Sequence, residues 1–61
     1  MEWSCFEDRK IPADWRVEAT DFDNEGVVYV TIFSGPEAHE RAGEYAAIKN
    51  AQEARLARIA S

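Results

Sequence analysis

The sequence holds one cluster of acidic side chains whose spacing could bind a cation. Asp21-Phe22-Asp23-Asn24-Glu25-Gly26 follows the order found at the start of a calcium-binding loop. Such a loop needs a bidentate glutamate at its twelfth position, where this chain has Ile32. The residues after Gly26 favour a strand, so the carboxylates would not converge on one ion. A tight turn explains the segment, and we expect no metal ion and no cofactor.

A second chemical possibility is a thiol–imidazole pair. Cys5 and His39 are the only residues of their types, and such a pair could perform nucleophilic catalysis. Catalysis also needs an oxyanion hole and a substrate cleft, for which 61 residues leave little room. We expect Cys5 to be a small core residue and His39 to be neutral and exposed, with no catalytic residue. A small thiol enzyme using Cys5 stays as the catalytic alternative.

The charge distribution favours a protein partner over nucleic acid or membrane. The net charge is −5; residues 1–48 carry eleven acids against four bases, and residues 49–61 carry one acid against three bases. An acidic body repels nucleic acid and anionic lipid. We therefore predict a partner surface formed by Glu18, Asp21, Asp23 and Glu25. The alternative is an acidic inhibitor, or nucleic-acid mimic, that occupies a basic site on a partner protein.

Composition places the chain in the globular class, as one domain covering residues 1–61. A hydrophobic fraction of 46% is typical of a folded domain. The single cysteine excludes an internal disulfide. The first residues lack the pattern of a signal peptide, and no apolar run approaches the length of about 18 residues that a membrane span needs. The expected location is the cytoplasm.

The elements that position these residues begin with a β-hairpin over 15–33. Residues 15–22 alternate between apolar and polar, and residues 27–33 are all β-branched or aromatic. Asp23-Asn24-Glu25-Gly26 between them predicts a turn with Gly26 in the left-handed conformation. We expect Phe22 to lie opposite Val27, which places Val17 opposite Ile32. One face then carries Trp15, Val17, Ala19, Val28, Val30 and Ile32.

The opposite face of this hairpin is too apolar to be left in water. In the expected register it carries Phe22, Val27, Tyr29 and Phe33, beside Arg16, Glu18 and Thr20. Either Trp3–Phe6 or another chain could cover it. Residues 1–14 are expected to form a flap or loop, with a possible short strand at 3–6.

A helix is predicted over 36–60. Ser34-Gly35-Pro36-Glu37 supplies a helix start, and the apolar stripe consists of Ala38, Ala42, Tyr45, Ile48, Leu56 and Ile59, with Gln52 inside it. The fold class is therefore α+β, a small ββα unit in which an antiparallel hairpin packs on one C-terminal helix.

The lengths of these elements do not match, and this predicts a homodimer. A helix of about 25 residues is roughly 37 Å long, whereas a seven-residue strand spans about 23 Å. The expected dimer contacts are Phe22, Tyr29, Phe33, Leu56 and Ile59. In the competing monomer, Trp3–Phe6 folds over the second sheet face and the helix end frays.

Residues 15–50 carry a pattern that can be compared with known proteins. Trp15-Arg16-Val17-Glu18-Ala19, Val28-Tyr29-Val30, Phe33-Ser34-Gly35-Pro36-Glu37-Ala38 and Arg41-Ala42-Gly43-Glu44-Tyr45-Ala46 make up this pattern. It resembles small uncharacterised proteins of proteobacteria and their phages. The resemblance implies a strand–strand–helix unit in a bacterial or phage setting, with no known catalytic residues. Together these observations predict a small acidic, non-catalytic protein-interaction module.

Overall fold

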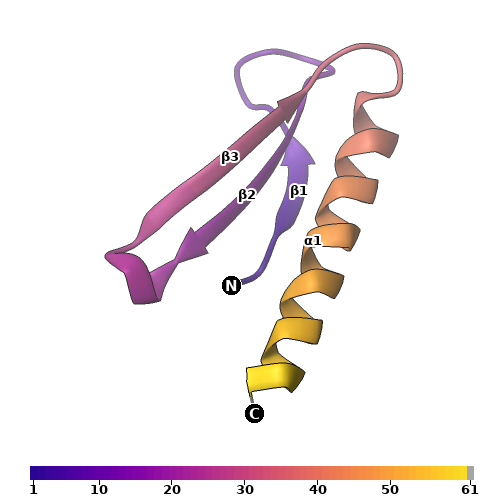
Figure 1. The fold of residues 1–61 in the computed structure, drawn as a ribbon. Coiled ribbons are helices and arrows are strands. Elements are labelled where there is room, and N and C mark those ends of the chain that lie inside the picture. The colour runs from indigo at the N-terminus through magenta and orange to yellow at the C-terminus, as the bar shows by residue number, and fades with distance from the viewer. Residues whose placement is uncertain (61) are drawn as a thin grey trace.

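A three-stranded antiparallel sheet and one helix make up the protein, as the computed structural model shows (Figure 1). The structure describes the backbone of residues 1–60 and the side chains of residues 1–57. The strands are β1 (Ser4–Glu7), β2 (Trp15–Asp21) and β3 (Val27–Phe33), and the helix is α1 (Ala38–Ala60). The sheet order is β1-β2-β3. The predicted α+β class, with a hairpin packed on a C-terminal helix, is confirmed.

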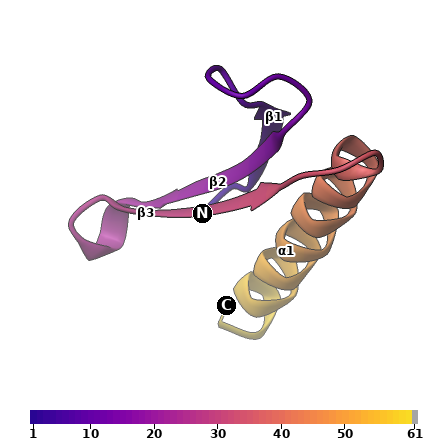
Figure 2. The same cartoon turned by 90° about the horizontal axis from the view of Figure 1, so that it is seen from above.

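The molecule is flat and elongated, with extents of 40 × 23 × 10 Å. Seen from above, α1 lies to one side of the twisted sheet, and the hairpin tip projects away from it (Figure 2). The hairpin tip and the end of α1 also point apart in Figure 1. The hairpin therefore covers only part of the helix, as the length mismatch predicts.

The N-terminal segment adds a strand to the sheet. The possible strand at 3–6 appears as β1, one residue later, and Cys5 lies opposite Val17 of β2. β1 pairs alongside β2 and does not fold over a sheet face. Of the segment Trp3–Phe6, which could have covered the second face of the hairpin, only Trp3 lies against that face, with its ring centroid 6.2 Å from that of Tyr29.

The hairpin loop is one residue longer than predicted, and this shifts the register. Residues Phe22–Asn24 form a 3₁₀ turn, so Asp21 lies opposite Val27. Glu25 and Gly26 both adopt positive φ, 57° and 73°, and the Gly26 N–H donates to the Asp21 carbonyl at 3.0 Å. The left-handed Gly26 is confirmed. The predicted opposition of Phe22 and Val27 is wrong, because Phe22 lies inside the turn.

A shift of one residue turns every β3 side chain to the other face of the sheet. Val17 lies opposite Thr31, and Ala19 lies opposite Tyr29. The helix-facing side of β3 therefore carries Tyr29, Thr31 and Phe33. The outer side carries Val28, Val30 and Ile32, which are 44–53% exposed. The prediction that these three residues share a face with Trp15, Val17 and Ala19 is wrong, as is the prediction that Tyr29 and Phe33 lie beside Arg16, Glu18 and Thr20.

Small residues make the contact between α1 and the sheet. Ala38, Ala42 and Ala46 recur every fourth position and are all buried. Their short side chains let the helix approach β2 closely, since residues four apart lie on one helix face. Ile48 and Leu56 are exposed, so the predicted stripe is correct for Ala38 and Ala42 but not for these two. The helix begins at Ala38, two residues after the predicted start. The Ala38 N–H donates to the Gly35 carbonyl at 3.1 Å, which forms a turn before the helix.

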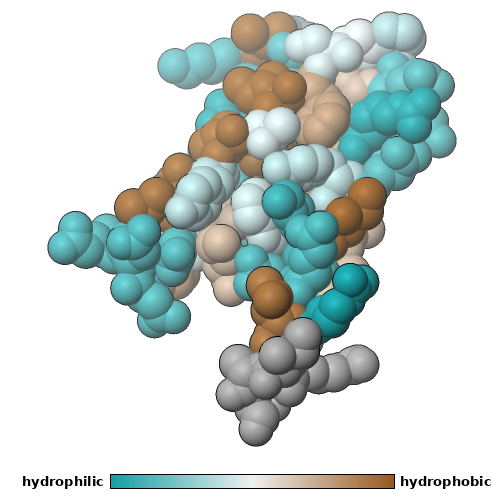
Figure 3. All heavy atoms as spheres, viewed as in Figure 1, coloured by the Kyte–Doolittle hydropathy of each residue, from teal (hydrophilic) through white to brown (hydrophobic). Residues whose placement is uncertain are grey.

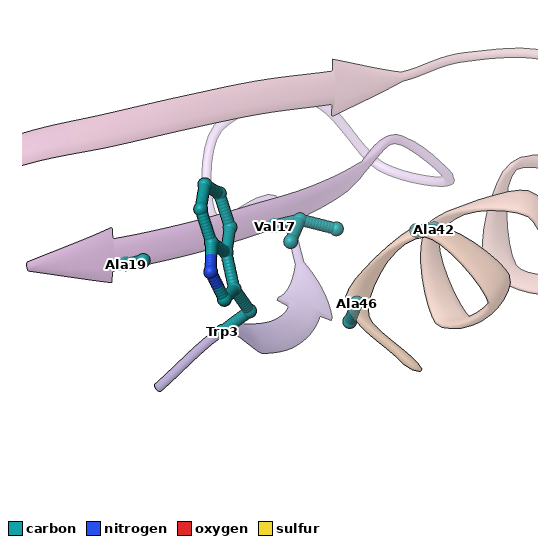
Figure 4. Packing of buried hydrophobic residues seen from close by; sticks show 5 residues of the cluster. All are labelled: Trp3, Val17, Ala19, Ala42 and Ala46. Atoms are coloured by element: carbon teal, nitrogen blue, oxygen red, sulfur yellow. The ribbon is translucent and has the colours of Figure 1, made fainter. Parts of the chain in front are cut away.

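The hydrophobic core is small and centres on Trp3. Figure 4 shows the Trp3 ring against β2 beside Ala19, with Val17 pointing toward Ala42 and Ala46 of α1. Among the described residues, Val17 is the one large side chain that is fully buried. The side chain of Asn50 holds Trp3 in place: Trp3 N–H donates to Asn50 Oδ1 at 2.9 Å, and Asn50 Nδ2 donates to the Trp3 carbonyl at 3.0 Å.

The register predicts unequal costs for the same substitution on neighbouring strands. Val17→Ala should lower the free energy of unfolding by about 2–3 kcal/mol, because it opens a cavity under α1. Val28→Ala, on the outer face, should cost about 0.5 kcal/mol. Urea denaturation followed by circular dichroism measures both. Equal losses would contradict the register.

Candidate interaction surface

The free edge of β3 is the most prominent unpaired feature of the fold. β3 bonds to β2 on one side only, because the sheet order is β1-β2-β3. On the other side, alternate residues of an antiparallel edge strand direct both N–H and C=O outward. All seven residues, Val27–Phe33, are β-branched or aromatic, with no charge and no proline. Figure 3 shows hydrophobic side chains following this strand. Such an edge readily pairs with another strand.

A groove of about 480 Å³ opens between this edge and the C-terminal half of α1. Its lining includes the consecutive residues Tyr29, Val30 and Thr31. Because successive side chains of a strand point to opposite faces, lining by three in a row means that the groove includes the edge itself. On the helix side it is bounded by Tyr45, Lys49, Gln52, Glu53 and Leu56.

Aromatic rings form the floor of this groove. Trp3 meets Tyr45 edge to face at 6.0 Å between ring centroids and lies 6.2 Å from Tyr29. Lys49 Nζ sits 5.4 Å from the Trp3 ring and 5.6 Å from the Tyr45 ring, within cation–π range. The buried Trp3 indole N–H has no acceptor among the described residues. The floor is therefore aromatic and is held by contacts from β3 and α1, with the unpaired indole N–H buried within it.

The outer sheet face is also uncovered, and it holds a hollow of about 470 Å³ that Phe6, Ile11 and Ile32 line together with charged residues. Val28, Val30 and Ile32 share it with Arg16, Glu18 and Thr20. Arg16 bonds to Glu18 at 2.8 Å and lies 3.5 Å from Asp8, so these charges are largely satisfied within the chain. The backbone groups of the strands beneath this face pair within the sheet, whereas the outward-directed groups at the β3 edge do not.

The structure separates the predicted dimer contacts into three places. Tyr29 and Leu56 both line the groove. Phe33 packs on Tyr45, with ring centroids 5.7 Å apart, and is half-buried. Phe22 lies at the hairpin tip and is 85% exposed. The side chain of Ile59 lies outside the described residues.

Three of the four acidic residues predicted as a partner surface lie at the hairpin tip, and the fourth lies apart from them. Glu18 lies on the outer sheet face, where it is paired with Arg16. Asp21 ends β2, and Asp23 and Glu25 lie in the hairpin loop. Within the described part of the chain, no group of three or more His, Cys, Asp or Glu side chains could hold a metal ion.

Cys5 and His39 occupy separate environments. Cys5 is half-buried and packs against the core from β1. The His39 ring stacks on Trp15, with centroids 3.7 Å apart and planes 3° from parallel. Between residues 1 and 57, no hydrogen bond joins the two side chains.

None of the helix that the structure describes has the length and hydropathy that a membrane span requires.

Trp3 is the groove residue that the sequence analysis missed as a core position. The alternation of Trp3, Ser4 and Cys5 has the period of a half-buried strand and could have indicated it.

Comparison of the chain with protein-family models, with curated proteins and with solved structures found no match. The surface must therefore be interpreted from its own chemistry.

The hydrogen bonds to the Asp8 carboxylate predict how the stability of the fold changes at low pH. The backbone N–H groups of Lys10 and Ile11 donate to Asp8 Oδ1 at 2.7 and 3.2 Å, and they lower the pKa of this carboxyl below 3.8, with help from Arg16. A depressed folded-state pKa contributes stability above pH 3.8 that is lost as the pH falls further. Asp8→Asn should therefore flatten the decline of the urea midpoint below this pH. A variant that declines as steeply as the wild type would contradict this role.

Proposed function

We propose that this chain is a non-catalytic protein-interaction module that binds by adding an extended strand to the free edge of β3. The observation that carries the proposal is the juxtaposition of that edge with an aromatic groove. The proposal includes a bacterial or phage setting, which the resemblance noted above implies. A free cysteine in a strand that packs on the core is consistent with the cytoplasm.

An exposed, uncharged edge strand is a liability that proteins normally protect. Natural edges are short, or carry lysine, proline or a bulge. β1, the opposite edge of this sheet, follows that rule with four residues that end in Glu7. β3 has seven residues and none of these protections. An edge left open in a chain with so small a core is better explained by binding than by stability.

The groove can supply the selectivity that backbone pairing lacks. In strand addition, main-chain hydrogen bonds provide affinity, and pockets for alternate side chains provide specificity. A strand added beside β3 would direct every second side chain toward Trp3, Tyr45 and Leu56. The intervening side chains would lie on the outer face beside Val28, Val30 and Ile32.

Titration with short extended peptides tests this mode of binding. The probes are nine-residue peptides of alternating apolar and polar residues, added to ¹⁵N-labelled chain at a concentration where it is monomeric. The amides of residues 27–33 and the Trp3 indole N–H should shift, while those of the outer-face loop 8–14 should not.

The matched control uses the same peptides with alternate backbone nitrogens methylated. Methylation removes the donors that strand addition needs and leaves the side chains intact. Methylated peptides should bind at least about tenfold more weakly. Equal binding of both peptide sets, or shifts confined to the outer face, would contradict the proposal.

A further inference from the structure

We infer that the strand that occupies the β3 edge is β3 of a second copy of this chain, paired antiparallel about a two-fold axis at Val30. This inference rests on the proposed function and names its partner. Two sheets joined in this way form one continuous six-stranded sheet. The axis is perpendicular to the sheet, because this is the symmetry that relates two antiparallel neighbouring strands. Both copies of α1 therefore lie on the same face.

The surface area of the chain supports a partner of this size. A compact monomer of 6.9 kDa exposes about 4000 Å². This chain exposes 4708 Å², an excess of about 700 Å² over that scaling. A stable interface buries about 800 Å² on each partner. The radius of gyration, 12.8 Å against about 10.5 Å for a compact domain of this length, shows the same excess. An interface of ordinary size would cover an area close to this excess surface.

The side chains of β3 are complementary to themselves in this arrangement. A centre at Val30 keeps all seven residues paired and places Val27 opposite the partner's Phe33, and Tyr29 opposite the partner's Thr31. Val28 falls opposite the partner's Ile32, and Val30 falls opposite itself. Each pair joins a β-branched residue to an aromatic or another β-branched residue, which are favourable cross-strand combinations. No charged residues face one another, although each chain carries a net charge of −5.

The groove accommodates the same partner strand. Tyr29 and Thr31 lie on the helix-facing side of the sheet, and so do their counterparts in the second copy. The partner's Tyr29 therefore lies on the side of the sheet where the groove opens.

Pairing at β3 also removes the unprotected edge. The six-stranded sheet would end on both sides in β1, which is four residues long. Short edges are one way in which natural sheets avoid further growth. The assembly therefore closes as a dimer and does not extend into a fibre.

A charge exchange at the two-fold axis tests the pairing. In sedimentation equilibrium, the wild type should pass from 6.9 kDa to twice that mass as its concentration rises through the micromolar range. Val30→Lys and Val30→Glu each place like charges opposite one another and should weaken the dimer about tenfold. An equimolar mixture of the two variants should restore a dimer, because Lys and Glu then lie opposite one another.

Val28→Lys is the matched control. Val28 lies on the same strand and face as Val30, with 53% exposure against 44%. In the proposed register, Val28 faces the partner's Ile32, so this variant should keep a dimer within about threefold of the wild type. If two outer sheet faces packed together instead, Val28→Lys and Val30→Lys would disrupt the dimer equally, and the inference would fall. Circular dichroism spectra matching the wild type establish that each variant is folded.

The outcomes separate this inference from the proposed function. A chain that stays at 6.9 kDa up to about 500 μM overturns the homodimer. If extended peptides still bind β3 in that case, the interaction module stands with another partner. If neither peptides nor a second copy bind, both proposals fail.

Discussion

Two consecutive left-handed residues at the end of the hairpin loop determine which side of β3 meets the helix. Glu25 and Gly26 accept positive φ, and Phe22 is drawn into the 3₁₀ turn before them. Tyr29 and Phe33 then join Trp3 and Tyr45 under α1. The same register turns three β3 side chains toward the outer face: Val28, Val30 and Ile32. A loop shorter by one residue would exchange these faces and remove the aromatic floor of the groove.

The helix contact explains why so much apolar surface remains outside the core. Alanines at 38, 42 and 46 let α1 approach β2 closely, but each contributes little buried area. A small domain with a thin core is marginally stable, and burial between subunits is one way to supplement it. The open β3 edge and the α1 residues Lys49 and Leu56 line the same groove. A single partner strand can therefore satisfy both.

Local patterns in the sequence were sufficient to predict the strands and the helix. They were insufficient to predict which side chains of β3 and α1 face the core. The alternation over 15–21, the β-branched run over 27–33 and the left-handed Gly26 follow from nearest-neighbour preferences. The register depends on loop length, because both Phe22 and Asp21 could close the turn. The choice between Ile48 and Ala46 as the inward helix residue depends on how near the sheet lies, which no periodicity specifies. The central position of Trp3 depends on contacts distant in sequence, with Asn50, which is 47 positions away, and with Tyr29 and Tyr45.

The most direct test of the β3 interface is an isotope-filtered NOE experiment on a dimer mixed from labelled and unlabelled chains. Such an experiment detects contacts between copies and none within a copy. The account predicts cross-peaks from the Tyr29 ring to the Thr31 methyl group of the other chain, and between the two Val30 side chains. A dimer whose contacts between copies all involve the hairpin tip, or the outer-face residues Phe6 and Ile11, would contradict it.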